Sequence, residues 1–225
     1  MFDETADLYD LVYSEKDYAA EAERLRRLVG REGGTLLDVA CGTGRHLSLL
    51  APHYRVEGVD LDPAMVELTR ARGLPAGQGD LLTLDLGRRF DVVTCLFSSI
   101  GYVADLRLAA ARLAAHVAPG GILAVEPWLG PQDMRQGFVG LVSAETESVK
   151  VARMSVVHVD GRASDLELQY LIGRDGAITR RTERHQLWLW TPDEYAEALT
   201  AAGLAPAYDD PGLTGRGLWL ATPAA

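Results

Sequence analysis

The sequence has little cysteine and no long apolar run, and both features narrow the class of protein. Only Cys41 and Cys95 occur among 225 residues, which argues against a disulfide framework and a cysteine-rich zinc site, so no metal is expected. No apolar run reaches the roughly 18 residues of a membrane span, and the acidic residues 1–10 lack the basic region and apolar core of a signal peptide. These absences favour a cytoplasmic protein that binds no membrane.

Basic side chains are also few relative to acidic ones. The chain has 22 Lys and Arg against 32 Asp and Glu, a net charge of −10 at pH 7. An acidic surface repels phosphate backbones, so no nucleic-acid partner is expected. With 48% hydrophobic and 24% charged residues, the composition is that of a globular protein. The length predicts a single domain over residues 1–225 that carries an elaboration.

Strand-like and helix-like segments alternate along the first 130 residues. Tyr18, Ala22, Leu25 and Val29, for example, form one helical stripe. This alternation is typical of a parallel α/β sheet with helices on both faces. The predicted strands are 35–44, which runs into a glycine turn, 54–62, 74–78, 90–98 and 122–128, and the predicted helices are 17–29, 45–52, 64–73 and 104–118.

The pattern changes after Pro131. Three alternating segments predict an antiparallel meander inserted at about residues 140–190, and its role as plain structure, lid or dimer interface stays open. With a helix and two short strands after it, the chain is expected to be α/β: a doubly wound, mostly parallel seven-stranded Rossmann-like sheet with an antiparallel β insertion. The segments are strands 149–159, 165–172 and 177–190, helix 191–203, and strands 206–209 and 216–222.

The main motif is the glycine turn between the first strand and the next helix, in which Asp38 precedes Gly42 and Gly44. Glycines at such a turn let a ligand approach the backbone, so Ala40, Gly42 and Gly44 are expected to bind a cofactor. A dinucleotide fingerprint would need a third glycine where Leu47 stands, and a carboxylate would repel a pyrophosphate. Asp38 favours a cation instead. S-adenosylmethionine (SAM) carries a sulfonium and an ammonium and no phosphate, whereas a nicotinamide oxidoreductase is the weakest alternative.

Two further carboxylates follow later strands. Asp60 ends the second strand, where its side chain can accept both ribose hydroxyls, and Leu61 lies beside it. Asp80 follows the third strand and can accept the adenine amino group, while the Leu81 N–H can donate to a ring nitrogen. Asp60 and Asp80 together predict a nucleoside-binding site at the carboxyl edge of the sheet.

Three more side chains are expected at the same edge. Met65, early in a helix, can cover one face of adenine, although plain core packing explains it equally well. Phe97 and Ser98 end the strand 90–98 and reach the lip of the sheet.

Together these motifs resemble the class I SAM-dependent methyltransferases: DVACGTG, GVDLDPAM, GDL, FDVVTCLFS and APGG, over about residues 35–127. DLYDLVY, KDYAAEA, ACGTGRHL, FSSIGYV, VEPW and GRGL extend a narrower resemblance to the actinobacterial amino-sugar N,N-dimethyltransferases of TDP-linked desosamine and mycaminose pathways. This resemblance implies N-methylation, twice, of a TDP-linked 3-amino-deoxysugar in antibiotic biosynthesis. It also implies a homodimer built partly through the extra β-structure.

The resemblance and the chemistry suggest further site residues. Tyr13 lies in a segment that in this family folds over the cofactor, and we hypothesise that Tyr13 and His185 lie near the amine as proton acceptors. His185 equally fits a half-buried strand histidine. Tyr18 and His46 are candidates for the cofactor carboxylate, although Tyr18 also fits plain packing.

Two residues are expected to meet the substrate. Glu126 ends a core strand, where it can bind an ammonium or have a purely structural role. Arg216 is expected to bind a pyrophosphate, because Arg matches phosphate oxygens in a bidentate way. Leu129 departs from the family's second aromatic residue after VEPW, which puts the sugar in doubt, and Asp62 replaces a small hydroxyl residue at a helix start, where Asp caps well. The alternatives are methylation of another amine or a hydroxyl, and a SAM-binding module without turnover.

Overall fold

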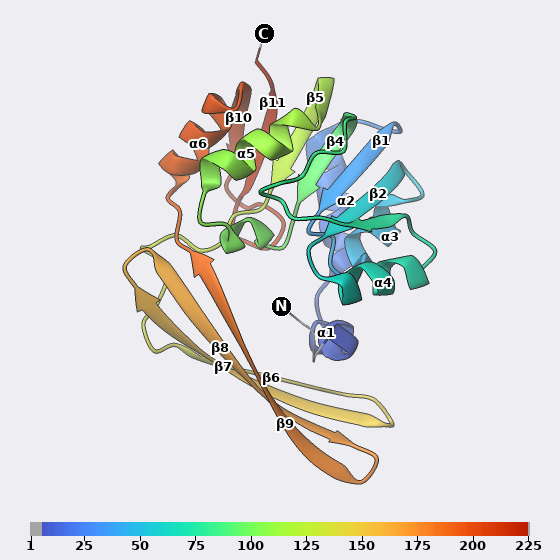
Figure 1. The fold of residues 1–225 in the computed structure, drawn as a ribbon, viewed down its shortest axis with the longest axis vertical. Helices are drawn as coiled ribbons and strands as arrows, with labels where there is room; N and C mark the ends of the chain where they lie inside the picture. The colour runs from blue at the N-terminus through green and yellow to red at the C-terminus, as the bar shows by residue number, and fades with distance from the viewer. Residues whose placement is uncertain (1–5, 225) are drawn as a thin grey trace.

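The computed structural model describes residues 6–224, which form an α/β core with a long four-stranded sheet beside it (Figure 1). The core sheet has seven strands in the order β10-β11-β5-β4-β1-β2-β3. Its strands are β1 (Thr35–Val39), β2 (Arg55–Asp60), β3 (Ala76–Gln78), β4 (Phe90–Cys95), β5 (Val117–Val125), β10 (Leu204–Asp209) and β11 (Leu218–Pro223).

The pairing of these strands gives the core its topology. The five strands from β3 to β5 run parallel, while β11 pairs antiparallel with both β5 and β10. The chain winds outward in both directions from β1 and β4, and ligands of such sheets bind outside the carboxyl ends at this switch point. The prediction of a doubly wound, mostly parallel seven-stranded sheet is confirmed.

Helices cover both faces of the core sheet. The side chains of Leu36 and Leu37 point to opposite faces of β1. Leu36 packs with α2 and α3, around Leu25, whereas Leu37 packs with α5 and α6, around Leu113. The helices are α1 (Ala6–Val12), α2 (Tyr18–Val29), α3 (Arg45–Leu50), α4 (Pro63–Ala71), the 3₁₀ helix η1 (Ser99–Tyr102), α5 (Leu106–Ala115) and α6 (Pro192–Ala201). No helix within residues 6–224 is both long enough and apolar enough to span a bilayer.

One predicted helix boundary is wrong. We expected a helix to residue 118 and a strand from 122, but α5 ends at Ala115 and β5 already begins at Val117. Phe90 pairs with Val117 and Val92 with Ile122, so the Pro-Gly-Gly segment forms an irregularity within the strand. A Pro-Gly-Gly sequence ends a helix as readily as it bulges a strand, and only the partner strand decides between them.

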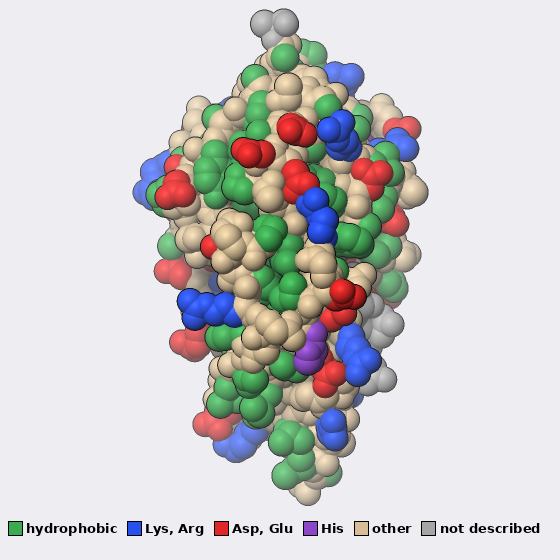
Figure 2. All heavy atoms as spheres, turned by 90° about the vertical axis from the view of Figure 1, so that its left-hand side faces the viewer, with side chains coloured by type: hydrophobic (Ala, Val, Ile, Leu, Met, Phe, Trp, Pro, Cys, Tyr) green, Lys and Arg blue, Asp and Glu red, His purple; other side chains and the backbone are tan. Residues whose placement is uncertain are grey.

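The antiparallel insertion has four strands, where the sequence predicted three. These are β6 (Val139–Glu145), β7 (Val149–Asp160), β8 (Ala163–Arg174) and β9 (Ala177–Trp188), in sequential order. The missed strand β6 lies at an edge, and its apolar residues Val139 and Leu141 are exposed. Because Val142 and Ala144 on the inner face are apolar as well, the segment lacks the apolar–polar alternation of a half-buried strand. Figure 2 shows hydrophobic side chains among charged ones at the lower end of the molecule, where this sheet lies.

The other face of the four-stranded sheet packs against α1. Leu8 and Val12 of this helix are buried in one cluster with Val151, Leu168 and Tyr170. In Figure 1 the helix lies between the core and the sheet. The N-terminal segment therefore joins the two parts of the molecule.

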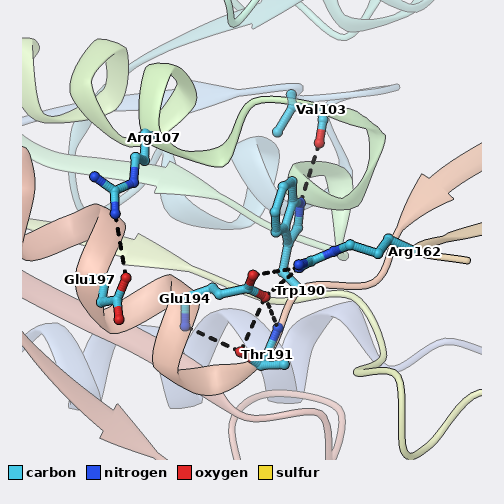
Figure 3. A network of polar contacts seen from close by, with 7 residues as sticks. All are labelled: Val103, Arg107, Arg162, Trp190, Thr191, Glu194 and Glu197. Carbon is cyan, nitrogen blue, oxygen red and sulfur yellow. Dashed lines mark hydrogen bonds and ion pairs between the residues drawn. The ribbon is translucent and has the colours of Figure 1, made fainter.

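A second connection between the two parts follows β9 (Figure 3). The Trp190 indole N–H donates to the Val103 carbonyl of the core at 3.3 Å. Thr191 and Glu194 form a capping box at the start of α6, and Arg162 from the turn between β7 and β8 donates to the same Glu194 carboxylate at 2.5 Å. The end of β9 is thus fixed to the core by an indole, a helix cap and an ion pair.

Candidate functional site

The glycine turn after β1 has the backbone conformation that its sequence predicted. Ala40, Gly42 and Gly44 have φ angles of 61°, 57° and 77°, all in the left-handed region. A Cβ on Gly44 would lie 2.9 Å from the side chain of Thr69 on α4. The start of α3 can therefore approach α4 this closely only with glycine at position 44. A Cβ on Gly42 would meet nothing within 4 Å, which leaves this stretch of backbone open to a ligand.

Two carboxylates meet beside this turn. Asp38 is 2% exposed and accepts a hydrogen bond from the Thr94 hydroxyl at 2.7 Å, and burial raises the pKa of its carboxyl to about 6. Asp60 accepts the N–H groups of Gly42 at 2.7 Å and Asp62 at 2.9 Å, and burial raises its pKa as well. A cationic ligand would stabilise both charged forms, so the electrostatics of the turn favour a cation.

Met65 and Asp80, which were predicted from the sequence, lie beyond the carboxyl ends of β2 and β3. Met65 in the first turn of α4 is 2% exposed, and Asp62 caps that helix by accepting the Ala64 N–H at 3.0 Å, which confirms the expected cap. Asp80 accepts the Leu82 N–H at 2.8 Å, which fixes the turn after β3. Met65, Asp80 and Leu81 border the same cavity as the glycine turn.

The lip after β4 is strained and held from behind. Phe97 and Ser98 have φ angles of 51° and 62°, which non-glycine residues adopt only when their surroundings impose them. The Glu126 carboxylate accepts the Phe97 N–H at 2.6 Å and the Thr214 hydroxyl, and Glu126 does not border the cavity. Glu126 therefore holds the backbone of the lip in place. This is the structural role that the sequence left open beside the binding of an ammonium.

The N-terminal segments bring a second polar group to the turn. His46 Nε2 lies 2.8 Å from Glu21 Oε2, and Lys16 forms an ion pair with the other oxygen of the same carboxylate. Burial acts to raise the pKa of Glu21, but the hydrogen bonds from His46 and Lys16 outweigh it and hold the pKa below its usual value. The Tyr18 ring meets the His46 ring at a centroid distance of 4.9 Å. The predicted pair, Tyr18 and His46, is therefore a packed unit on the cavity wall.

A cavity of about 780 Å³ lies between the core and the four-stranded sheet. Its core side holds the glycine turn and the lip, and its other side is formed by β7, β8 and β9 and by the segment before β6. Of the predicted site residues, Gly44, Glu126 and His185 do not border it. Those that do are Tyr13, Tyr18, Asp38, Ala40, Gly42, His46, Asp60, Leu61, Met65, Asp80, Leu81, Phe97, Ser98 and Arg216.

The two residues predicted near an amine lie in different positions. The Tyr13 hydroxyl accepts a hydrogen bond from Arg153 Nη1 at 3.0 Å, and its ring meets the edge of Phe97 at the cavity wall. His185 is 2% exposed and lies 3.0 Å from the Tyr102 hydroxyl through Nδ1. Tyr102 borders the cavity, so it connects His185 to the cavity.

Several cavity residues with charged or titratable side chains were not singled out from the sequence, among them Arg45, Tyr102, Arg135 and Arg153. Arg153 could have been found, because the alternation of β7 places it on the same face as the buried Val151 and Val157. An arginine on an otherwise apolar face indicates a buried partner or a ligand. Arg216, which was predicted, donates to Ser98 Oγ at 3.0 Å and lies over the Trp128 ring.

Comparison with known proteins gives consistent matches. The profile of a methyltransferase domain family matches residues 13–207. The chain is 43% identical to the dTDP-3-amino-3,6-dideoxy-alpha-D-glucopyranose N,N-dimethyltransferase of Streptomyces fradiae, over 99% of this chain and 92% of that protein.

Two solved structures are similar over almost their whole length. Streptomyces venezuelae DesVI superposes with a TM-score of 0.91 at 36% identity, covering 97% of this chain and 98% of that one. SAM-bound CalS10, an amino pentose methyltransferase from Micromonospora echinaspora, superposes with a TM-score of 0.81 at 40% identity, covering 92% and 90%.

Proposed function

Because this chain belongs to the methyltransferase domain family, we propose that it is the SAM-dependent enzyme that methylates, twice, the amino group of a TDP-linked amino-deoxysugar. The observation that carries the proposal is the 43% identity to an N,N-dimethyltransferase of this class over both the core and the four-stranded sheet. Both sides of the cavity, and not the cofactor side alone, therefore resemble an enzyme with that substrate.

The residues at the glycine turn fit the cofactor. The open backbone at Gly42 leaves room for a ligand, and the buried carboxylates of Asp38 and Asp60 suit a ligand that carries cationic groups and ribose hydroxyls. We propose that Asp38 faces the ammonium, that Asp60 accepts from the ribose, and that Asp80 and Met65 hold the adenine. When bound, SAM supplies a methyl group on a sulfonium, whose loss needs no protonation of the leaving group.

The cavity as a whole also fits an anionic substrate. Although the chain carries a net charge of −10, four arginines border the cavity: Arg45, Arg135, Arg153 and Arg216. A diphosphate on an acidic protein needs a local cation, and the guanidinium group matches phosphate oxygens in a bidentate way. We propose that Arg216 binds the diphosphate of the nucleotide sugar.

The remaining site residues orient the two ligands. We propose that Tyr18 and His46 contact the carboxylate of the cofactor, with Glu21 and Lys16 behind the imidazole. Tyr13 and Phe97 are in edge-to-face contact on the cavity wall. For a transfer between a preformed donor and a neutral amine, alignment of the two is the main contribution of the protein, and it can supply several kcal/mol.

We further propose that the chain forms a homodimer through the outer face of the four-stranded sheet. Leu141 lies opposite Met154, and Ala152 opposite Leu171, so these residues share one face. Leu141 is 67% exposed and Ile178 is 79% exposed. Contiguous exposed apolar side chains mark an interaction surface, and closed two-fold pairing is the commonest way to cover one.

The function is tested by turnover. The protein is incubated with SAM and TDP-3-amino-3,6-dideoxyglucose, and the sugar product is weighed by mass spectrometry. We expect a product with one added methyl group early and two later. Products methylated on a hydroxyl, or no product in the presence of SAM that calorimetry shows to be bound, would refute the proposal.

A titration with NAD beside the titration with SAM completes the test. We expect binding of SAM alone, because Asp38 and the position of Leu47 disfavour a pyrophosphate at the turn. Tight binding of NAD would exclude the proposed cofactor site.

A further inference from the structure

Behind the cavity wall, four polar side chains from η1, β8 and β9 form a continuous chain of contacts. Tyr102 Oη lies 3.0 Å from His185 Nδ1, and His185 Nε2 lies 3.5 Å from Glu183 Oε2. Tyr170 donates its hydroxyl proton to the same Glu183 oxygen at 3.1 Å. His185 and Glu183 are buried, and Tyr102 is the member of the four that borders the cavity.

The chemistry of Glu183 sets the direction of these hydrogen bonds. A carboxylate only accepts, so the nitrogen that faces it, His185 Nε2, carries the proton of the neutral imidazole. Nδ1 is then an acceptor, and the Tyr102 hydroxyl donates to it. Because the Tyr102 proton points away toward His185, the lone pairs on its oxygen are free to accept from a group in the cavity.

The hydroxyl of Tyr13 accepts a hydrogen bond from a protein group, whereas the hydroxyl of Tyr102 donates one. Arg153 donates to the Tyr13 hydroxyl at 3.0 Å, and its guanidinium lies over the Tyr13 ring at 5.1 Å from the centroid. A guanidinium is a donor and a fixed positive charge, so it disfavours the arrival of a second proton on that oxygen. Of Tyr13 and Tyr102, Tyr102 is therefore the better proton acceptor.

We infer that Tyr102 takes a proton from the substrate amine and passes its own proton to His185, which Glu183 holds in the accepting orientation. The inference rests on the proposed function, because an amine that arrives as an ammonium must lose a proton before it can attack. Tyr102 is thus a catalytic residue, His185 receives the proton through it, and Glu183 is a positioning residue.

The proton movements balance. The ammonium N–H bond breaks and its proton forms a bond to Tyr102 Oη, while the Tyr102 O–H bond breaks and that proton joins His185 Nδ1. The tyrosine ends neutral, the amine regains its lone pair, and the new imidazolium lies beside the Glu183 carboxylate. Burial raises the pKa of Tyr102, which keeps its hydroxyl protonated and suits a group that relays a proton without ionising.

Other charged and titratable groups face this chain of contacts. Tyr170 on β8 anchors Glu183, and Arg153 on β7 interacts with Tyr170 and Tyr13. Tyr13 and Asp60 also act on Tyr102 through their charge. The positive charge of Arg153 is thus directed at Tyr13 and Tyr170.

The test compares Tyr102→Phe and His185→Gln with the wild type in single turnovers at saturating SAM and amino sugar, from about pH 6 to about pH 9. We expect the rate of each variant to fall about 10²-fold near neutral pH, the lower end of what a positioned acid–base group supplies. The rate should recover as the pH rises, because the amine then arrives without its extra proton. A loss that is equal at every pH, or no loss, would overturn the inference.

The matched control is Gln186→Ala, next to His185 on β9 but on the opposite, outer face, where the side chain donates to Asp165. It should keep the wild-type pH profile. SAM affinity by calorimetry and the thermal midpoint check that each variant is folded, and Tyr102→Phe keeps the shape of the ring.

A second readout does not depend on activity. Nitrogen-15 NMR of the histidines, with His185→Gln to assign the signal, should show neutral His185 protonated on Nε2, and Glu183→Gln should reduce that tautomer preference. A proton on Nδ1 in the wild type would overturn the inference. If the wild type methylates no amino sugar the proposed function fails, whereas an active wild type with unaffected Tyr102 and His185 variants refutes the relay alone.

Discussion

Charged side chains of both signs border the cavity. On the core side, Asp38 lies in β1, Asp60 ends β2 and Asp80 follows β3, and Arg45 and Arg216 lie on the same side, while Arg135 and Arg153 belong to the segment before the four-stranded sheet and to the sheet itself. The cavity therefore offers carboxylates to a cationic ligand and guanidinium groups to an anionic one. Electrostatic complementarity of this kind fixes orientation more than it adds affinity.

Arg216 is the residue at which binding of the anionic ligand can be tested. We expect Arg216→Gln to raise the KM for the nucleotide sugar about tenfold or more, because a hydrogen bond to a charged group is worth about 1.5–3 kcal/mol. The kcat should change little, since a diphosphate contact is equally strong before and during the transfer. Steady-state kinetics measure both constants.

Because Arg216 also donates a hydrogen bond to Ser98, the Arg216→Gln variant needs a control for damage to the lip. An unchanged affinity for SAM would show that the lip is intact, and Arg107→Gln, which removes an exposed arginine on α5, should leave the KM as it is. An unchanged KM in Arg216→Gln would mean that another group binds the diphosphate.

At the scale of elements, the core was predictable because its sequence signals are local. Gly42 and Gly44 have positive φ angles, which glycine indicates directly in the sequence, whereas Ala40 has the same conformation without such a signal. Cavity contacts that join distant segments have no such signal. The Tyr102–His185 hydrogen bond joins residues 83 positions apart, so the sequence could place His185 on a strand face but not behind a tyrosine. Likewise β6 was missed because apolar residues lie on both of its faces, Val139 and Leu141 outward and Val142 and Ala144 inward.

The helix cap at α6 gives a prediction about the stability of one element (Figure 3). Thr191 accepts the Glu194 N–H at 3.3 Å and donates its hydroxyl to the Glu194 carboxylate at 3.1 Å. We expect Thr191→Ala to lower the free energy of unfolding by about 1 kcal/mol. For a chain of this length that loss corresponds to a fall in the thermal midpoint of about 2–4 °C, measured by differential scanning calorimetry.

Glu197→Gln on the same helix is the control for the cap. Its carboxylate pairs with Arg107 at 3.4 Å, and both side chains are largely exposed. Exposed ion pairs contribute little, so its thermal midpoint should stay close to that of the wild type. A midpoint as high in Thr191→Ala as in this control would show that Arg162 alone holds Glu194 and the start of the helix.

At the scale of the whole molecule, the cavity exists only between the two sheets. The core alone supplies the turn and the lip, and β7, β8 and β9 supply the opposite wall, including Arg153 and Leu187. We therefore propose that the chain acts as one domain with the insertion as an essential part. The opposite face of that sheet remains exposed on the single chain, which is the basis for the proposed dimer.

The dimer is tested by placing charge on that outer face. Leu141 and Met154 lie opposite each other on β6 and β7, and two-fold symmetry would bury both of them twice. We expect Leu141→Glu with Met154→Glu to raise the dimer dissociation constant by about 10²-fold or more, because an unpaired buried polar group costs about 1–3 kcal/mol and a charged group costs more. Sedimentation velocity over a range of concentrations measures the constant.

Leu108→Glu serves as the matched control, because Leu108 is an exposed leucine on α5 of the core, away from the four-stranded sheet. It should sediment as the wild type does, and SAM binding by both variants would show that the glycine turn is folded. A wild-type chain that sediments as a monomer, or a double variant that dimerises as tightly as the wild type, would refute this interface. Since α1 and the cavity lie on the opposite face of the same sheet, a monomeric variant that still binds SAM and methylates the sugar would show that each chain carries a complete site.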